Sequence, residues 1–134
     1  MICFQTFVVD VNNESLNAIQ ETVSSFIIAT KSHEADESLC ASDDFNDMLL
    51  FLAFDMSILS VTPSIYSIYC KQVREEYIHV EEAVYCSRRA AFLRQLLASG
   101  KSVLNGKLGP EAEVRVKINL EWECSHLESG SLVP

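Results

Sequence analysis

"EVRVKINLEW", residues 113–122, decides whether this chain of 134 residues is entirely helical. Its apolar residues occupy every second position: Val114, Val116, Ile118, Leu120 and Trp122. On that alternation alone the stretch predicts a strand. Pro110 followed by Glu111, just before it, is instead typical of a helix start. Because a single strand in an otherwise helical chain has no partner to pair with, we predict a helix here.

The rest of the chain carries helical patterns. Helices are predicted at about 13–32, 45–60, 63–79 and 81–99. The stretch LLFLAFDMSIL, residues 49–59, is apolar on most sides, so the second of these helices is expected to be the central buried one. Asn12 or Asn13 can cap the first helix, and Thr62 followed by Pro63 suits the start of the third.

These elements predict an all-α fold of about five helices. Residues 33–43 and 101–109 are expected to be loops. A chain of this length can bury a core of its own, so we expect one helical domain over 1–125, followed by a disordered tail at 126–134.

Composition and charge exclude several classes of protein. The net charge is −9, and residues 1–60 hold ten acids but only one base, Lys31, which argues against binding to a nucleic-acid backbone. No apolar run approaches the roughly 20 residues of a membrane helix, and no signal peptide is expected. The five cysteines, at 3, 40, 70, 86 and 124, form no C-x-x-C pair. They are typical of reduced thiols in a cytoplasmic protein.

Two side chains are candidates for metal binding. His33 follows the apolar stretch FIIATKS, and Asp55 lies inside LLFLAFDMSIL. Helical spacing places Asp55 on the side of Leu52 and Leu59, facing the core, where a carboxylate is costly unless it is paired or bound to a metal. Taken singly, each residue also has a structural interpretation: His33 as a helix-end residue, and Asp55 as an acid bonded to Ser57 or to a facing tyrosine or arginine.

The ordered series ATKSHE, LLFLAFDMSIL, YCKQVREEYIHV, RRAAFLRQLL and VKINLEWE resembles one branch of the HD-domain superfamily, the predicted metal-dependent phosphohydrolases. The resemblance covers about residues 16–123, and QVREEYIHV is its most specific part. It implies an incomplete HD-like helical bundle, a divalent metal and a phosphate-ester substrate. In the metal site it implies, His33 is the histidine of A-T-K-x-H and Asp55 is the closing aspartate. Arg74, Glu76 and Tyr77 match V-R-x-E-Y, and Arg89 matches a later arginine.

The chain departs from this family pattern in its metal ligands. The family also uses an upstream histidine and a His-Asp doublet, whereas the only histidines here are His33, His79 and His126, and none precedes an aspartate. Ala53 and Phe54 replace an aspartate and an alanine of the family's L-D-A-D-L. The chain therefore looks like the C-terminal, truncated part of an HD protein. One imidazole and one carboxylate cannot hold a metal tightly, so the chain is expected to bind metal weakly or not at all and to be catalytically impaired.

Arg74, Glu76, Tyr77 and Arg89 are candidates for substrate binding or for structural roles. The arginines could bind phosphate, or they could pair with neighbouring acids: Glu75, Glu76, Glu81 and Glu82. The tyrosines, Tyr66, Tyr69, Tyr77 and Tyr85, could pack at the edge of the core or stack on bases. The alternative function is a non-catalytic helical interaction module, which forms a homo- or hetero-oligomer through an exposed apolar face.

Overall fold

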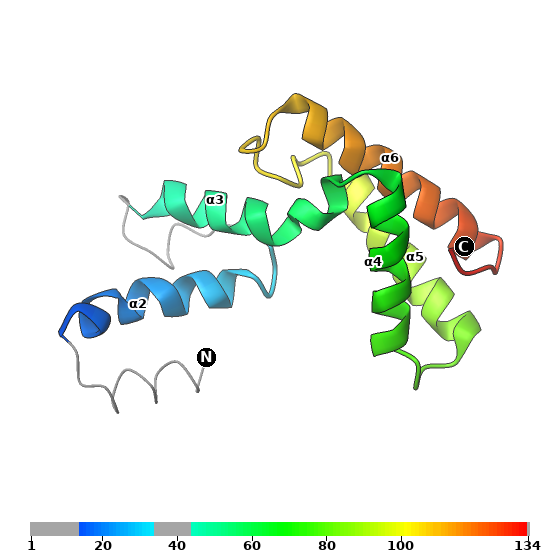
Figure 1. Ribbon diagram of the computed structural model, residues 1–134, viewed down its shortest axis with the longest axis horizontal. Coiled ribbons are helices and arrows are strands. Elements are labelled where there is room, and N and C mark those ends of the chain that lie inside the picture. Colours follow the sequence, from blue (N-terminus) through cyan, green and yellow to red (C-terminus); the bar gives the residue numbers. More distant parts are fainter. Residues whose placement is uncertain (1–13, 34–43, 134) are drawn as a thin grey trace. The chain divides into compact units, whose positions relative to one another are not determined.

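The computed structural model describes residues 14–33 and 44–133. Over these residues the chain is helical and contains no strand, which confirms the all-α prediction (Figure 1). Five α-helices and one 3₁₀ helix account for the regular structure. The chain divides into two compact units, Met1–Asp55 and Met56–Pro134. We refer to them as the N-terminal and the C-terminal unit.

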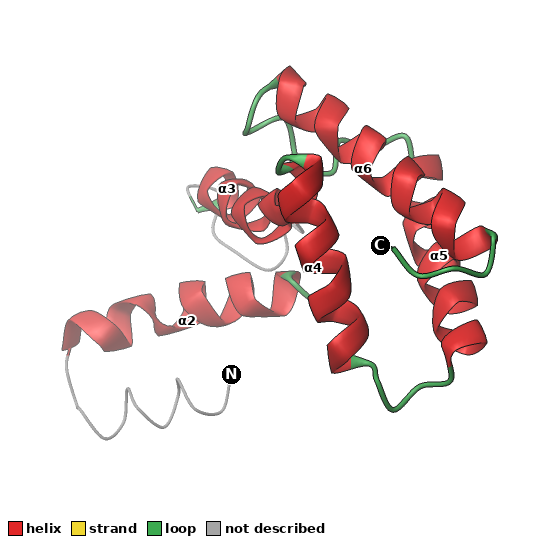
Figure 2. Ribbon diagram, turned by 45° about the vertical axis from the view of Figure 1, so that its right-hand side comes forward, coloured by secondary structure: helices red, strands yellow, loops and turns green. Residues whose placement is uncertain are grey.

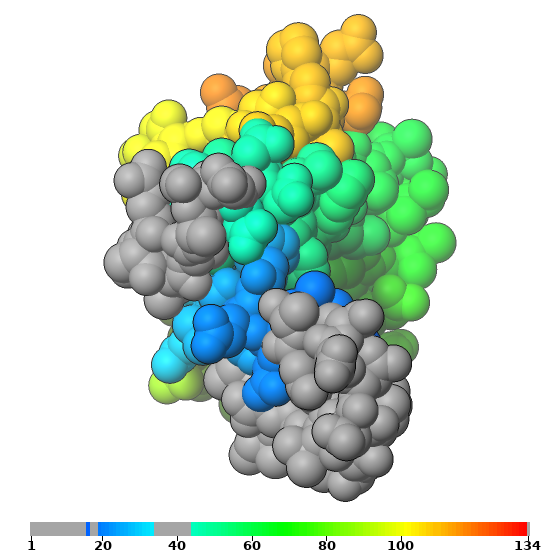
Figure 3. All heavy atoms as spheres, turned by 90° about the vertical axis from the view of Figure 1, so that its left-hand side faces the viewer, coloured from blue at the N-terminus to red at the C-terminus, as the bar shows by residue number. Residues whose placement is uncertain are grey.

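The N-terminal unit is built from α2 (Glu14–Ala29) and α3 (Phe45–Asp55). Its core contains Ala29, Met48 and Leu52, with Phe26 packed against them. The Phe26 and Phe51 rings lie 5.5 Å apart, and atoms of the two helices meet directly in Figure 3. These contacts join the two helices because both carry apolar residues at helical spacing. The expected caps at Asn12 and Asn13, and most of the loop predicted at 33–43, lie outside the described residues.

The helix predicted at 45–60 changes character at Met56. α3 ends at Asp55, and a 3₁₀ helix, η2 (Met56–Ser60), follows directly. Met56 and Leu59 are buried, but Phe54 is 59% exposed. The prediction of one continuous, buried helix is therefore wrong. The 3₁₀ turn advances by three residues per turn, so residues after Asp55 do not continue the face that α-helical spacing predicts.

The C-terminal unit contains η2, α4 (Pro63–Glu76), α5 (Glu82–Ala98) and α6 (Pro110–Glu128). α6 packs against α5, η2 and α4 (Figure 2). Thr62 and Pro63 begin α4 as predicted, although the Thr62 side chain makes no capping hydrogen bond. The carboxylate of Glu81 caps α5 by accepting from the backbone N–H groups of Ala83 and Val84, each at 3.0 Å.

The alternating stretch 113–122 is helical, as predicted. Val116 and Leu120 are fully buried on one side of α6, whereas Val114 and Ile118 are each 55% exposed on another. α6 also includes His126, Leu127 and Glu128, which the sequence assigned to a disordered tail. α6 thus continues to Glu128, beyond the predicted start of the tail at residue 126. The helix ends in a defined turn, in which Gly130 has a φ of 74°.

Within the part of the chain that is described, no single helix is long and apolar enough to cross a membrane. The segments Phe45–Ser60 and Pro63–Glu76 meet that test only when they are taken together.

Candidate functional site

His33 stands at the end of α2 in a backbone conformation that is rare for a histidine. Its φ is 53°, and its N–H donates to the carbonyl of Ala29 at 2.9 Å. Glycine usually fills this left-handed position after a helix because a Cβ is unfavourable there. Residues held in such conformations cluster at functional sites, so a histidine here points to a role for its side chain.

Asp55, the last residue of α3, lies beside this imidazole. The Nδ1 atom of His33 is 3.2 Å from the Oδ2 atom of Asp55, and the two side chains are 31% and 42% exposed. The pair is within ion-pair distance but is not aligned for a hydrogen bond, and Nδ1 is itself buried without a hydrogen-bond partner. Asp55 is thus not the core-facing acid that helical spacing predicted. The change to 3₁₀ geometry at Met56 explains why Asp55 and Leu59 no longer share a face, but not why Asp55 is more exposed than Leu52 within α3.

The geometry of this pair suits two ligands of one metal ion. Imidazole nitrogens and carboxylate oxygens lie about 2.0–2.2 Å from a divalent metal. At octahedral or tetrahedral angles, two such atoms are about 2.8–3.6 Å apart, and the observed separation of 3.2 Å falls within that range, as it also does within the range of a simple ion pair. The unpartnered Nδ1 would also gain a partner. Among the described residues, however, no group of three or more histidine, cysteine, aspartate or glutamate side chains is placed to share a metal.

A second polar centre lies inside the C-terminal unit, around the carboxylate of Glu123. Glu123 is 1% exposed and accepts a hydrogen bond from the Tyr66 hydroxyl at 2.5 Å. Its other oxygen accepts from the Nε atom of Arg89 at 2.8 Å, and the Nη2 atom of Arg89 lies 3.3 Å from the first oxygen. The buried carboxylate is therefore matched by one cation and one hydroxyl, which is the condition for keeping a charge in a core.

The protonation states of this centre follow from its burial. Burial raises the pKa of the Tyr66 hydroxyl, and the Glu123 carboxylate raises it further, so the phenol stays protonated. Burial lowers the pKa of the Arg89 guanidinium, but the hydrogen bonds and the charge of Glu123 outweigh this effect and raise it. Both groups are thus fixed as donors to Glu123 over the physiological pH range.

Arg74 and Tyr77 take part in the turn between α4 and α5. The Arg74 guanidinium donates to the carbonyls of Tyr77, at 2.6 Å, and Val80, at 3.1 Å, and lies 4.9 Å above the centre of the Tyr85 ring. Glu76 is exposed, and Tyr77 is about half exposed. Arg74 is therefore bonded to backbone carbonyls, whereas Arg89 is paired with Glu123. Neither forms an ion pair with the neighbouring acids that the sequence suggested.

Glu123 and its partner Tyr66 were not singled out as a pair by the sequence. The signal was present, because Val116, Asn119, Leu120, Glu123 and Leu127 follow a helical spacing and are all buried. An asparagine and a glutamate in such a stripe need partners. The two-residue alternation of the same segment makes this helical stripe of buried residues difficult to recognise.

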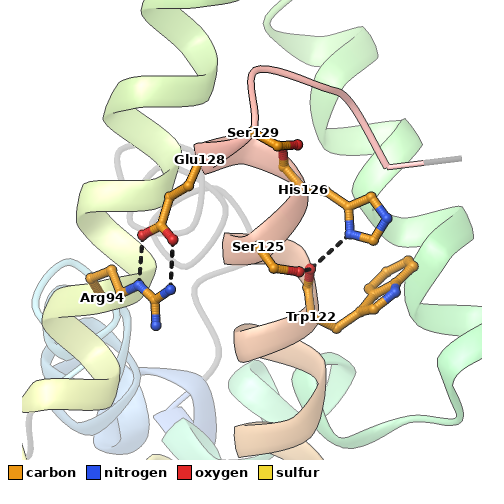
Figure 4. A network of polar contacts seen from close by, with 6 residues as sticks. All are labelled: Arg94, Trp122, Ser125, His126, Glu128 and Ser129. Carbon is orange, nitrogen blue, oxygen red and sulfur yellow. Dashed lines mark hydrogen bonds and ion pairs between the residues drawn. The ribbon is translucent and has the colours of Figure 1, made fainter.

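An exposed pair of the same kind joins α5 to α6 a few residues further on. Arg94 donates through Nε and Nη2 to the two carboxylate oxygens of Glu128, each at 2.7 Å (Figure 4). In the same view, the Nδ1 atom of His126 lies 2.9 Å from the carbonyl oxygen of Trp122. The Arg94 and Glu128 side chains are 48% and 46% exposed, so this pair provides a natural comparison for the buried one.

The Cys70 thiol is expected to be unreactive in the folded protein. Burial, together with the charge of Glu123, raises its pKa from 9.0 to about 12. Because the thiolate is the reactive form, alkylation by iodoacetamide at pH 8 should be about 1,000-fold slower than for an ordinary thiol. The rate should keep rising about tenfold per pH unit beyond pH 9, where an ordinary thiol levels off. Peptide mapping by mass spectrometry after timed alkylation measures this rate.

The control for Cys70 is the same protein in concentrated urea, where its thiol should react at the ordinary rate. Equal rates in the folded and the unfolded protein at pH 8 would contradict the burial of this thiol beside Glu123.

Comparisons of the chain with protein-family models, with curated proteins and with solved structures find no significant match.

Proposed function

We propose that the chain is related to the HD-type metal-dependent phosphohydrolases and that His33 and Asp55 form part of a divalent-metal site. The observation that supports this proposal is the 3.2 Å separation of His33 Nδ1 and Asp55 Oδ2. The two residues are 22 positions apart in sequence, and the family resemblance identifies both as ligands independently of their distance. The unusual backbone of His33 supports a role for its side chain in the same way.

In such a site a bound metal would activate a water molecule for attack on a phosphate ester. His33 would supply a neutral nitrogen ligand, and Asp55 would supply an oxygen ligand and one negative charge. Two protein ligands leave most of the coordination sphere to water, so binding by these residues is weak and hydrolysis is impaired. Arg74 and Arg89 are held by internal partners, which favours structural roles over substrate binding.

Metal binding is testable through a variant that should not damage the fold. His33→Gly removes the imidazole but places glycine where the backbone has positive φ, so stability should be unchanged or raised by about 1 kcal/mol. Its affinity for Mn²⁺, Ni²⁺ or Zn²⁺ should fall at least about tenfold, equivalent to about 1.4 kcal/mol. Asp55→Ala should lower the affinity to a similar degree. Calorimetric titration, with thermal unfolding measured in parallel, gives both quantities.

The matched controls are His79→Ala and His126→Ala, which remove the other two histidines and should leave metal affinity unchanged. Metal binding that is equal in the wild type, His33→Gly and Asp55→Ala would exclude this site. Absence of any binding to the wild type would exclude it too.

A non-catalytic interaction module is the second candidate function. It is supported by large apolar side chains that are exposed on both units, among them Ile28 and Phe54 in the N-terminal unit and Ile68 and Ile118 in the C-terminal unit. Exposed apolar side chains are a feature of surfaces that contact other proteins when they form a contiguous patch. If metal binding is absent and sedimentation shows a stable metal-free oligomer, this function replaces the first.

A further inference from the structure

The C-terminal unit contains a pocket of about 240 Å³ that the metal proposal does not use. It is bounded by α4 through Cys70, Lys71 and Arg74, and by α5 through Tyr85. Glu123 and Leu127 of α6 line it as well, and the residues after α6 complete the wall. The volume is below the roughly 300 Å³ at which drug-sized sites begin, so its ligand is small.

The chain after α6 supplies an apolar part of this wall. Gly130 adopts positive φ and its N–H donates to the carbonyl of Leu127, while Ser131 N–H donates to the carbonyl of His126, each at 3.1 Å. This pair of bonds is the Schellman arrangement, which reverses the chain at a helix end. The reversal, visible in Figure 2, brings Leu132 and Val133 back to the pocket, where both are partly buried.

The hydroxyl of Tyr85 forms no hydrogen bond with a described residue. The side chain is 5% exposed, and its ring is held beneath the Arg74 guanidinium. Glu123 and Cys70, which also line the pocket, act on its phenol electrostatically, so the polar end of the ring lies at the pocket. Burial raises the pKa of Tyr85, which keeps the proton available for donation. Buried tyrosine hydroxyls usually find a partner, and a ligand can provide it.

The charges around the pocket favour an anion. Lys71 and Arg74 contribute two positive charges, and Lys71 forms no ion pair with a described residue. Glu75 contributes one negative charge, and that of Glu123 is already matched by Arg89. One positive charge is left over beside an apolar wall and a free donor. A few polar groups on a mostly apolar pocket are the usual composition of a small-molecule site.

We propose that this pocket binds a small organic carboxylate, whose oxygen accepts from the Tyr85 hydroxyl and whose short apolar body packs against Leu132 and Val133. Lys71 selects the anion, and the charge of Arg74, whose guanidinium stays bonded to the Tyr77 and Val80 carbonyls, adds to the positive potential. The pocket is too small for a nucleotide, and it lies wholly within the C-terminal unit. Its test is therefore independent of the metal titration.

The test is a titration of the ¹⁵N-labelled full chain with hexanoate, followed by NMR. Saturable shifts are expected for the amides next to Tyr85, Cys70 and Leu132. Tyr85→Phe keeps the ring under Arg74 and should weaken hexanoate binding at least fivefold, and Leu132→Ser should weaken it severalfold. The matched controls are Tyr77→Phe, which removes an exposed tyrosine hydroxyl, and Ile118→Ser, which removes an exposed apolar side chain of α6. Both should bind as the wild type does.

Equal binding of 1-hexanol or hexylammonium would overturn the selection of an anion. Binding of inorganic phosphate but not hexanoate would overturn the carboxylate. Absence of saturable shifts at 20 mM hexanoate, on the order of the weakest affinity that a ligand of this size should show, would overturn the site itself. Unchanged binding in Tyr85→Phe would overturn the assigned donor.

Discussion

Replacement of Glu123 by alanine is expected to lower the free energy of unfolding of the C-terminal unit by about 3–5 kcal/mol. The variant leaves the Arg89 guanidinium, whose side chain is 13% exposed, without its counter-charge inside the protein. It also leaves the Tyr66 hydroxyl without an acceptor. Uncompensated burial of a charge is among the most destabilising single changes, and here a second polar group is orphaned with it. Urea unfolding followed by circular dichroism measures the loss.

The comparison for this variant is Glu128→Ala, which removes the acid of the exposed pair with Arg94. Both pairs join α5 to α6 across the same sequence separation of 34 residues, and they differ chiefly in burial. Solvent already screens the exposed pair, so Glu128→Ala should leave the unfolding free energy nearly unchanged. Equal losses in the two variants would refute the role of burial. The double variant Arg89→Met/Glu123→Leu should recover much of the lost stability, because it removes both charges together.

Replacement of Asn119 by alanine should have the second largest effect, a loss of about 2–4 kcal/mol. The Asn119 side chain is 2% exposed, and its Nδ2 atom donates to the carbonyls of Leu59 and Val61, each at 2.9 Å. These two carbonyls flank the corner between η2 and α4. In the variant these carbonyls lose their hydrogen-bond donor inside the protein. The free-energy cost of this loss adds to the cost of the cavity that the smaller side chain leaves. Asn119→Asp should be worse than alanine, because it directs a carboxylate at two carbonyl oxygens. The measurement is again equilibrium unfolding in urea.

Arg115 provides the matched control one turn earlier on α6. Its Nε atom donates to the carbonyl of Ser60, between the two carbonyls that Asn119 binds, at 2.8 Å. Arg115 is exposed, so water can replace it in Arg115→Ala, and the loss should be less than half of that in Asn119→Ala. If Arg115→Ala were the more destabilising variant, the corner would depend on the exposed bond and not on the buried amide.

The segment 113–122 shows how far sequence reasoning reached. Its alternation favours a strand, whereas the absence of a second predicted strand to pair with favours a helix. The structure explains the ambiguity. Val116 and Leu120 form one face of α6, while Val114 and Ile118 form another that is exposed, so two helical stripes offset by two residues imitate a strand. The local pattern therefore does not distinguish a strand from a helix, whereas the need of a strand for a pairing partner does.

The candidate metal residues were selected by resemblance, and their proximity could not be derived from spacing. Spacing placed Asp55 toward the core, but the structure leaves 42% of its side chain exposed beside His33. The expected alignment of Asp55 with Leu59 fails at Met56, where the helix changes to 3₁₀ geometry. No residue at this point is a recognised signal for such a change. The pairing of Glu123 with Arg89 likewise depends on the packing of α6 against α5. These two residues are 34 positions apart, so local sequence patterns cannot predict their contact.

The position of α6 in the chain has a consequence for synthesis on the ribosome. Its side chains are the hydrogen-bond partners of polar groups that lie 34 to 60 residues earlier in the chain: the guanidinium of Arg89, the hydroxyl of Tyr66 and the carbonyls near Leu59. Until Glu123 and Asn119 have left the exit tunnel, those groups must stay hydrated, because the helix that α4 and α5 both pack against is missing. Contacts of such long range form late and slowly. Co-translational folding of the C-terminal unit therefore waits for its last described helix, and a nascent chain that stalls before α6 exposes the surfaces chaperones recognise.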